Sequence, residues 1–219
     1  MKKYLIKLLT LFIASLLTAN WAFAANPVVL VLGDSLSAAY GLPENSGWVH
    51  LLRTRLASYT QPYDVVNASI SGDTTRGGLS RIPTALKQFS PEIVIVELGG
   101  NDALQGLPLK STFNNLDMIV GQIKKAGAKP IIVGVEIPPN YGPSYTKLFS
   151  KVFGDIATKH TTPLVPSIFQ GFGYKRELFQ SDGIHPVASA QSLMMETVWK
   201  GLEPVLRKSP STSPSQGKL

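Results

Sequence analysis

Short, β-branched apolar runs alternate along this chain with stretches whose apolar residues have helical spacing, and this alternation limits the possible folds more than any other feature. Runs of this kind are typical of buried strands. They occupy residues 28–32, 64–68, 93–98, 131–135 and 164–165. The helical stretches lie at about residues 48–56, 75–87, 116–123, 145–160 and 186–206. Strands that alternate with helices predict an α/β fold with a parallel sheet between helix layers.

Five such strands predict a three-layer α/β/α domain with a defined strand order. Because crossovers between parallel strands are right-handed, the flavodoxin-like order 2-1-3-4-5 is the commonest arrangement of five strands. This order puts the first strand between the second and the third. The loops that leave these three strands therefore meet at one edge of the sheet.

Residues 1–24 have the pattern of a secretory signal peptide. The segment starts with basic residues, residues 8–19 are mostly apolar, and Ala22 and Ala24 place small side chains at the −3 and −1 positions. Those twelve apolar positions would cover about 18 Å as a helix, against about 30 Å of hydrocarbon core, which is too short for an anchor. We predict cleavage near Ala24, a periplasmic or secreted mature protein, and no stable membrane anchor.

The rest of the chain divides into one folded domain at residues 25–207 and a tail at residues 208–219. The tail is rich in Ser and Pro and has almost nothing apolar to bury, so we expect it to be disordered. The domain shows no internal repeat and no interdomain linker. We expect it to act as a monomer.

Composition excludes several classes of function. With no cysteine and three histidines, the chain lacks thiol nucleophiles and disulfides and has few soft metal ligands, so we expect neither a metal nor another cofactor. The formal charge of +7 falls to +4 without the three lysines of the signal segment, and no basic run concentrates it. Nucleic-acid binding is therefore not expected, because phosphate affinity needs basic residues gathered on one face. The sequence has no phosphate-cradling glycine motif that would support nucleotide binding.

Small polar residues follow each of the first three predicted strands. Asp34 and Ser35 come directly after the first strand, Gly72 lies in the loop after the second, and Asn101 and Asp102 follow the third. Because these strands are neighbours in the predicted sheet, we expect the three loops to converge. Asp34 is expected to orient the turn around Ser35, and Asp102 to hold the loop of Asn101.

Three residues that are distant in the sequence supply the parts of a catalytic triad. A serine nucleophile needs a base, and an imidazole serves best when a carboxylate holds its second nitrogen. Ser35, His185 and Asp182 provide these groups, and the last two stand three residues apart before the final predicted helix. The backbone N–H groups of Ser35 and Gly72 and the side-chain amide of Asn101 could stabilise the oxyanion. A glycine at position 72 leaves the approach to its N–H unobstructed.

The predicted topology permits this triad. The fifth strand lies about 14 Å from the first, at about 4.8 Å per strand. The eighteen residue steps from Ser167 to His185 can span several times that distance at about 3.3 Å each. Taken singly, each motif is ordinary turn chemistry. A flavodoxin-like module that only binds a ligand would also place polar loops at this edge, but it gives no reason for Asp182 and His185 to accompany Ser35.

Together the motifs resemble the four sequence blocks of the SGNH, or GDSL, hydrolase family, in the same order and over about residues 28–206. The blocks correspond to Gly33-Asp34-Ser35-Leu36, the segment 67–74 around Gly72, Gly99-Gly100-Asn101-Asp102 and Asp182-Gly183-Ile184-His185-Pro186. The chain is most similar to the periplasmic branch of thioesterases, lysophospholipases and arylesterases. This resemblance implies that Ser35, Asp182 and His185 form the triad. It also implies that Ser35, Gly72 and Asn101 form the oxyanion hole.

The same resemblance implies a substrate class. We expect residues 25–207 to be a serine esterase and thioesterase that cleaves small-molecule acyl esters, thioesters or lysophospholipids through an acyl-Ser35 intermediate. A carbohydrate O-acetylesterase is the alternative within enzymes, because the same family removes acetyl groups from glycans.

Apolar residues in the loops after the third and fourth predicted strands are candidate substrate contacts. They are Leu104, Leu107, Leu109, Pro139 and Tyr141. Exposed near Ser35, they would form an apolar slot for an acyl chain or aromatic ring, whereas buried they would belong to the core. Residues 137–142 are similar to a mobile loop that closes over the acyl chain in that branch, although Pro139 fixes φ and could stiffen the loop.

Overall fold

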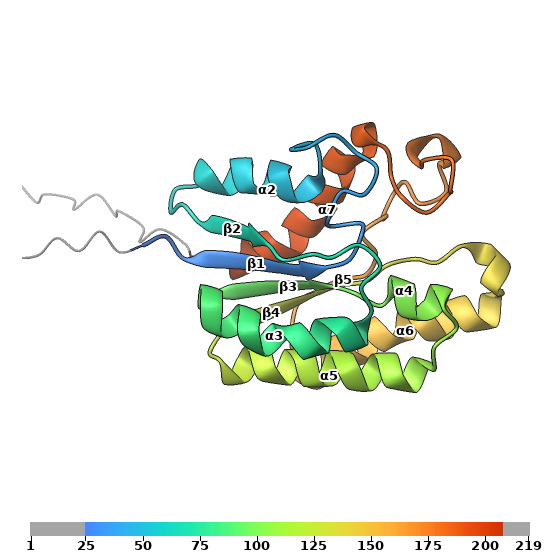
Figure 1. Ribbon diagram of the computed structural model, residues 1–219, viewed down its shortest axis with the longest axis horizontal. Coiled ribbons are helices and arrows are strands. Elements are labelled where there is room, and N and C mark those ends of the chain that lie inside the picture. The colour runs from blue at the N-terminus through green and yellow to red at the C-terminus, as the bar shows by residue number, and fades with distance from the viewer. Residues whose placement is uncertain (1–24, 208–219) are drawn as a thin grey trace, which may run out of the picture.

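Five parallel strands form the centre of the computed structural model, which describes residues 25–207 (Figure 1). They are β1 (Val28–Gly33), β2 (Asp64–Asn67), β3 (Ile93–Glu97), β4 (Lys129–Val133) and β5 (Leu164–Val165). The sheet has the order β2-β1-β3-β4-β5, and every neighbouring pair is parallel, so the predicted order is confirmed. The predicted signal peptide at residues 1–24 and the predicted tail at residues 208–219 lie outside the described residues.

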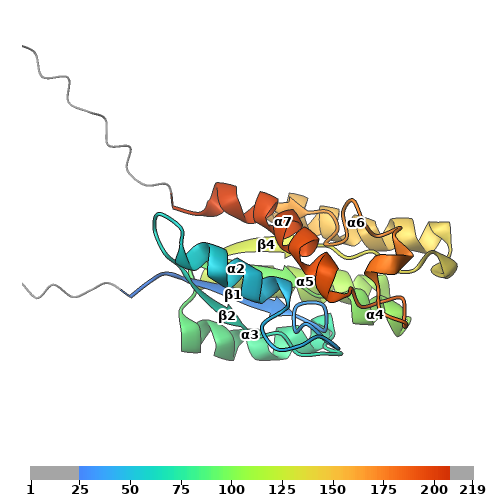
Figure 2. The ribbon, with the colours of Figure 1, turned by 90° about the horizontal axis from the view of Figure 1, so that it is seen from above.

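Helices cover both faces of this sheet. They are α2 (Trp48–Ala57), α3 (Thr75–Phe89), α4 (Gly100–Leu104), α5 (Leu109–Lys125), α6 (Pro143–His160) and α7 (Gln191–Leu202). On one face α2 packs against α7, and on the other α5 packs between α3 and α6 (Figure 1). In Figure 2, the view from above, α2 and α7 lie on the side of the sheet that faces the viewer. The predicted three-layer α/β/α architecture is confirmed.

Burial on both faces explains the apolar composition of the strands. All five residues of β3 are buried, and Val94 in this strand lies opposite Leu30 of β1 and Pro130 of β4. A sheet that is covered on both sides favours β-branched side chains at every position, not at alternate ones. The strands are therefore mostly apolar, with the buried Glu97 at the end of β3 as an exception.

Helix ends follow local chemistry. The Thr74 side chain caps α3 by accepting a hydrogen bond from the Gly77 N–H at 3.3 Å. Ser90 and Thr161 end α3 and α6 in the left-handed region, with φ values of 44° and 48°. These ends turn the chain back toward β3 and β5.

The fourth strand begins and ends earlier than the predicted segment 131–135. It starts at Lys129, which lies opposite Ile93, and it ends at Val133. The apolar run continues past the sheet because Val135 is buried in the following loop, where it lines a cavity. Burial alone therefore does not mark the end of a strand.

The predicted single helix at residues 186–206 is wrong in extent. One-turn 3-10 helices at Ala188–Ala190 and Glu203–Val205 flank α7. Pro186 instead pairs with Phe179 in an isolated antiparallel bridge. Residues 186 and 187 thus extend the loop that carries His185, and the helix begins only after them.

The segment after β3 is mostly helical, not a loop as expected. Leu104 ends α4, and Leu109 begins α5 well before the predicted start at residue 116. Polar residues dominate the first two turns of α5 and hide the helical period. Leu109 packs against the core as a result.

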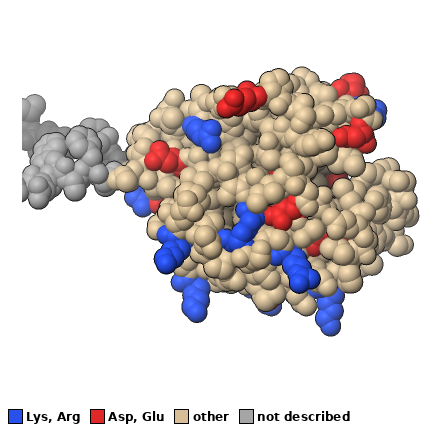
Figure 3. Space-filling model, viewed as in Figure 1, with Lys and Arg blue, Asp and Glu red and all other residues tan. Residues whose placement is uncertain are grey.

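Charged side chains are interspersed with uncharged ones on the face shown in Figure 3. No helix among residues 25–207 combines the length and the apolar character that a membrane span requires. In the same part of the chain, no group of three or more His, Cys, Asp or Glu is arranged to hold a metal ion. The chemistry-bearing residues gather instead at the carboxyl edge of the sheet.

Candidate active site

Ser35 lies in a tight turn directly after β1. The Asp34 side chain accepts a hydrogen bond from the Leu36 N–H at 3.0 Å, and the Asp34 carbonyl accepts one from the Ala38 N–H at 2.9 Å. The Ser35 carbonyl accepts from the Tyr40 N–H at 3.1 Å. Asp34 thus orients the turn as expected, and the turn places Ser35 in the wall of a large cavity.

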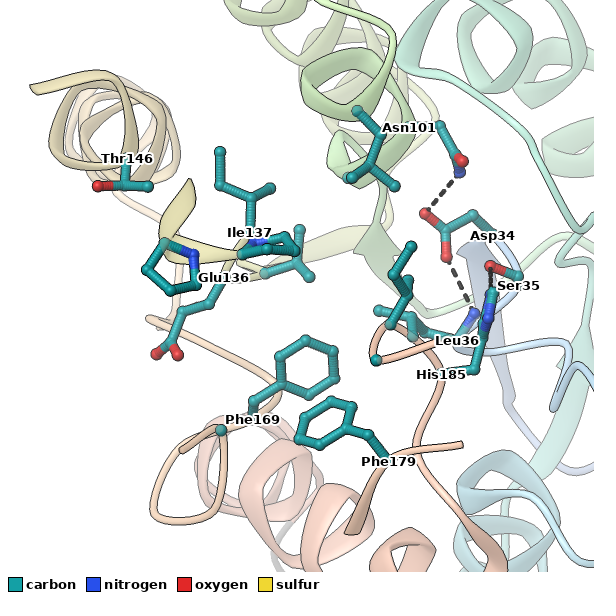
Figure 4. Close-up of a pocket in the computed structure, with 18 of the residues that line it drawn as sticks. Asp34, Ser35, Leu36, Asn101, Glu136, Ile137, Thr146, Phe169, Phe179 and His185 are labelled. Atoms are coloured by element: carbon teal, nitrogen blue, oxygen red, sulfur yellow. Dashed lines mark hydrogen bonds between the residues drawn. The ribbon is translucent and has the colours of Figure 1, made fainter. Parts of the chain in front are cut away.

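His185 and Asp182 complete a hydrogen-bonded chain with Ser35. The Nε2 atom of His185 lies 2.8 Å from the Ser35 Oγ, as Figure 4 shows, and its Nδ1 lies 2.7 Å from the Asp182 Oδ2. A carboxylate partner holds the proton on Nδ1, which leaves Nε2 to accept the proton of the serine hydroxyl. The structure therefore brings together the three residues that the sequence nominates for the triad.

The Asp182 carboxylate is held by its own loop. Its Oδ1 accepts hydrogen bonds from the N–H groups of Ile184 at 2.8 Å and His185 at 3.0 Å. Although partial burial opposes the charge, the hydrogen bonds from the His185 ring and from these two N–H groups lower the pKa of Asp182 to about 2. Asp182 is therefore ionised throughout the neutral range and can stabilise a protonated imidazole.

Two backbone N–H groups in the cavity wall are available to an oxyanion. Within residues 25–207, neither the Ser35 N–H nor the Gly72 N–H donates a hydrogen bond. Gly72 has a φ of +81°, and a Cβ placed on it would meet nothing within 4 Å. The open space at Gly72 and its left-handed backbone fit the role that the sequence suggests for this glycine.

Asn101 lies beside them at the start of α4, and its amide is held by two acceptors. Its Nδ2 donates to the Asp34 Oδ2 at 3.1 Å, shown in Figure 4, and to the Asp73 carbonyl at 2.9 Å. Both hydrogens of this amide are therefore engaged within the protein. Asn101 can act on an oxyanion only if one of these bonds is exchanged for a bond to the substrate.

Asp102 anchors the Asn101 helix from behind. It is buried and accepts hydrogen bonds from the Thr75 N–H at 2.8 Å and from the Thr112 hydroxyl at 3.3 Å. The Thr75 hydroxyl also donates to it. Asp102 thus ties α4 to the beginnings of α3 and α5 and holds the loop of Asn101, as expected.

Arg81 fixes the loop of Gly72, a role that the sequence patterns do not reveal. Its guanidinium donates to the Gly33 carbonyl at 3.1 Å, to the Ala68 carbonyl, and to the Asp73 carboxylate at 2.7 Å. The two carbonyls lie at the ends of β1 and β2, and Asp73 directly follows Gly72. In the sequence Arg81 looks like any basic residue on an amphipathic helix, so no local signal distinguishes it.

A buried pair of carboxyl groups lies beneath the nucleophile turn. Burial raises the pKa of Glu97 well above its usual range, and the nearby Asp34 raises it further. Burial also raises the pKa of Asp34 to about 6, although the Leu36 N–H and His185 favour its charged form. Glu97 accepts a hydrogen bond from the Ser37 hydroxyl at 2.7 Å. A single carboxylate within an apolar strand could have indicated a buried carboxyl group with a raised pKa, because unpaired charges are rarely buried.

The cavity beside Ser35 has a volume of about 1150 Å³ and a mostly apolar wall. Ile137, Phe169 and Phe179 extend this wall away from the Ser35–His185 pair, and Glu136 and Thr146 lie at the far end in Figure 4. A space of this size and polarity suits an acyl chain or an aromatic group. No sequence pattern marks Phe169 and Phe179, because they belong to the irregular segment after β5, where the sequence has no periodicity that would indicate burial.

Two of the five predicted substrate contacts line this cavity, namely Leu104 and Pro139. Leu107, Leu109 and Tyr141 are not among the residues that line it. Leu109 belongs to the core because it opens α5. The Tyr141 hydroxyl donates to the Leu104 carbonyl at 3.3 Å, and its ring stacks on Tyr145.

Two known proteins are similar in sequence to most of this chain. Esterase TesA of Pseudomonas aeruginosa is 46% identical over 183 residues, which cover 84% of this chain and 91% of the relative. The thioesterase 1/protease 1/lysophospholipase L1 of Escherichia coli K12 is 40% identical over 183 residues, which cover 84% of this chain and 86% of the relative.

A solved esterase structure and a family model are also similar to this chain. The crystal structure of the psychrotrophic esterase EstA from Pseudoalteromonas, inhibited by monoethylphosphonate, matches with a TM-score of 0.77 and 37% identity. The match covers 83% of this chain and 99% of that one. Residues 31–193 match the model of the GDSL-like lipase/acylhydrolase family. The chain therefore belongs to the GDSL-like lipase/acylhydrolase family.

Proposed function

We propose that this protein hydrolyses acyl esters and thioesters through a covalent acyl-Ser35 intermediate. One observation carries the proposal: the Ser35 Oγ lies 2.8 Å from the His185 Nε2, while Asp182 holds the other ring nitrogen at 2.7 Å. A protein that only binds a ligand needs no such series of hydrogen bonds. In a hydrolase the imidazole of this series removes the serine proton as the serine oxygen attacks the substrate.

The reaction has two symmetrical halves. In the first, His185 takes the hydroxyl proton while the Ser35 Oγ bonds to the carbonyl carbon, and the leaving alcohol or thiol departs with the proton from His185. In the second, His185 takes a proton from water, the resulting hydroxide attacks the acyl carbon, and the Ser35 Oγ recovers its proton as the acid is released. Asp182 remains ionised and stabilises the imidazolium in both halves.

The oxyanion formed in each half faces three donors. The N–H groups of Ser35 and Gly72 supply two of them without rearrangement. The Asn101 amide supplies the third by turning one hydrogen from its internal acceptor to the oxyanion. Each such donor contributes on the order of 2.7 to 4 kcal/mol to transition-state stability in comparable sites.

Acyl chains longer than acetyl are the substrates that the cavity favours. An acetyl group would leave most of a cavity of about 1150 Å³ unfilled, whereas a longer chain buries apolar surface against Ile137, Phe169 and Phe179. The relatives named esterase and thioesterase 1/protease 1/lysophospholipase L1 support esters, thioesters and lysophospholipids as the substrate class. The apolar wall argues against the alternative of a carbohydrate O-acetylesterase.

The proposed arrangement of the chain follows the sequence pattern. Residues 1–24 serve as a signal peptide, residues 25–207 act as a monomeric hydrolase in the periplasm or outside the cell, and residues 208–219 form a tail without a role in catalysis. N-terminal sequencing of the exported protein and its sedimentation velocity test this arrangement.

Hydrolysis of a p-nitrophenyl ester series from acetyl to palmitoyl, by the parent and by Ser35→Ala, tests the function. We expect turnover by the parent with a kcat/KM that rises beyond the acetyl ester, and loss of turnover in Ser35→Ala. A parent that binds octanoate but hydrolyses no ester or thioester would be a binding module. Activity confined to acetyl esters and acetylated glycans would support the O-acetylesterase instead.

A further inference from the structure

The sheet alone does not determine the distance between His185 and Ser35. In the sheet, β3 and β4 separate β1 from β5, which places the ends of β1 and β5 about 14 Å apart at about 4.8 Å per strand. The chain between β5 and α7 contains only 3-10 turns and irregular backbone. Contacts between the two loops must therefore set the 2.8 Å separation between the His185 Nε2 and the Ser35 Oγ.

Gln180 lies directly opposite His185 in a short hairpin. The Gln180 N–H donates to the His185 carbonyl at 2.7 Å, and the Val187 N–H donates to the Leu178 carbonyl at 2.9 Å. The isolated bridge between Phe179 and Pro186 lies between these two bonds. The backbone of Gln180 is thus fixed to the backbone of His185.

The side chain of Gln180 crosses to the loop of the nucleophile. Its Nε2 donates to the Tyr40 carbonyl at 2.9 Å and to the Pro186 carbonyl at 3.3 Å. The Tyr40 N–H in turn donates to the Ser35 carbonyl at 3.1 Å. One continuous path of hydrogen bonds therefore joins the backbone of His185 to the backbone of Ser35, and Gln180 provides its only side chain.

The nucleophile loop is shaped to receive this side chain. Gly41 has a φ of +74°, and a Cβ placed on it would lie 2.4 Å from the Gln180 Oε1. Only glycine allows so close an approach together with this backbone. The Tyr40 ring also packs on the His185 ring, with centroids 4.6 Å apart. Gln180 itself is absent from the cavity wall.

We infer that Gln180 is a positioning residue that sets the distance between His185 and Ser35 by linking their two loops. The inference rests on the proposed function, because the distance matters only if a proton passes between these atoms. Loss of the link removes no triad side chain and leaves Ser35 in place, but it lets the His185 hairpin drift. A misplacement of about 1 Å can cost about 100-fold in rate.

Gln191 provides a matched control. Like Gln180, Gln191 links the segment after β5 to the segment after β1. Its Oε1 accepts a hydrogen bond from the Trp48 N–H at 2.9 Å, and the residue is 2% exposed. This bond joins the beginnings of α2 and α7, and the Gln191 Nε2 donates to the Val187 carbonyl at 3.5 Å, so neither bond touches the backbone of Ser35 or His185. Loss of this buried acceptor should lower the stability of the fold and leave the triad distance unchanged.

The test compares Gln180→Met and Gln191→Met, which each replace the amide by an apolar group of similar length. Four quantities are measured: kcat on p-nitrophenyl octanoate, the rate constant for phosphonylation by a fluorophosphonate, the inhibition constant of octanoate, and Tm. In Gln180→Met we expect kcat and the phosphonylation rate to fall about 10- to 100-fold, with a smaller change in the octanoate inhibition constant, because the hairpin carries Phe179 but not Ile137 or Phe169 of the apolar wall. In Gln191→Met we expect a lower Tm, with kcat within about twofold of the parent because the triad distance is kept.

Specific results would overturn the inference. The inference is wrong if the kcat of Gln180→Met lies within twofold of that of an active parent. It is also wrong if Gln180→Met and Gln191→Met lose kcat equally. If Gln180→Met does not fold, Gln180→Asn replaces it, because this variant keeps the amide but is one methylene too short to reach Tyr40, and it must show the same loss. A parent that hydrolyses no ester or thioester refutes the proposed function, and the inference falls with it.

Discussion

The two halves of the site are held in place in different ways. Ser35, Gly72 and Asn101 lie on the segments that follow three adjacent strands, so the hydrogen bonds of the sheet bring them together. Asp182 and His185 lie on a hairpin after β5, beyond two intervening strands, and hydrogen bonds between loops hold them. The oxyanion half therefore tolerates the loss of one side chain better than the acid–base half, where few contacts determine the geometry.

Asp182→Asn should have the largest effect and tests the acid–base half. An asparagine keeps the size of the side chain but no longer fixes the proton on His185 Nδ1, so the ring presents the wrong tautomer to Ser35. We expect kcat on p-nitrophenyl octanoate to fall by about 10⁴-fold, as the equivalent change does in serine proteases.

Circular dichroism of Asp182→Asn should match that of the parent. A fall of less than tenfold would show that the carboxylate neither orients nor stabilises His185.

Asn101→Ala should have the next largest effect and tests the oxyanion half. Loss of the amide removes one of three donors, so we expect kcat to fall by about 10²- to 10³-fold. Asn114, an exposed residue of α5, provides the control, and Asn114→Ala should match the parent. If the two variants have equal kcat values, Asn101 has no role in the oxyanion hole.

Arg81→Met should have a smaller effect on rate and a clear effect on stability. The Gly72 loop would lose its link to the ends of β1 and β2. We expect kcat to fall by about tenfold, because a small displacement of the Gly72 N–H from the oxyanion slows the reaction. Three carbonyl or carboxylate acceptors would also lose a charged donor, which should reduce the free energy of unfolding by about 1.5 to 3 kcal/mol.

Arg76→Met, at an exposed position in the same helix, is the control for Arg81. Urea denaturation of both variants measures the difference in unfolding free energy. Equal stability of the two variants would contradict the role of Arg81.

The contrast between the halves also explains what the sequence could predict. Ser35, Gly72 and Asn101 follow apolar runs directly, and the commonest strand order brings such positions together. His185 and Asp182 could be nominated only by their chemistry, because no local pattern shows that a hairpin after β5 returns to β1. The contacts of Gln180 and Arg81 depend on the tertiary fold and leave no mark in the sequence.

The substrate cavity was predicted less well than the triad, for a physical reason. Leu109 and Tyr141 are apolar and near the correct strands, but one begins a helix that packs on the core and the other bonds to Leu104. Whether an apolar residue near a strand end faces a cavity or the core depends on where the next helix begins. Phe169 and Phe179 face the cavity from irregular chain that shows no pattern at all.

Glu97→Gln should have the smallest effect and concerns stability alone. Burial raises the pKa of Glu97 above the value of about 4.3 that it has in the unfolded chain. Its neutral form therefore contributes stability below about pH 4.3, and this contribution is lost as the pH rises toward the folded pKa. Glutamine does not ionise, so the variant should gain stability relative to the parent as the pH rises from about 4.3 through the raised folded pKa of Glu97.

Thermal unfolding of the parent and Glu97→Gln at a series of pH values measures this gain. A difference in Tm that stays constant over the range would show that Glu97 has an ordinary pKa in the folded protein.

Peptide mapping by mass spectrometry after reaction with a fluorophosphonate tests the central claim most directly. We expect a single phosphonyl group on the peptide that contains Ser35, no labelling in Ser35→Ala, and slow labelling in His185→Ala. Labelling at another residue, or none in a protein that turns over octanoyl esters, would contradict the account.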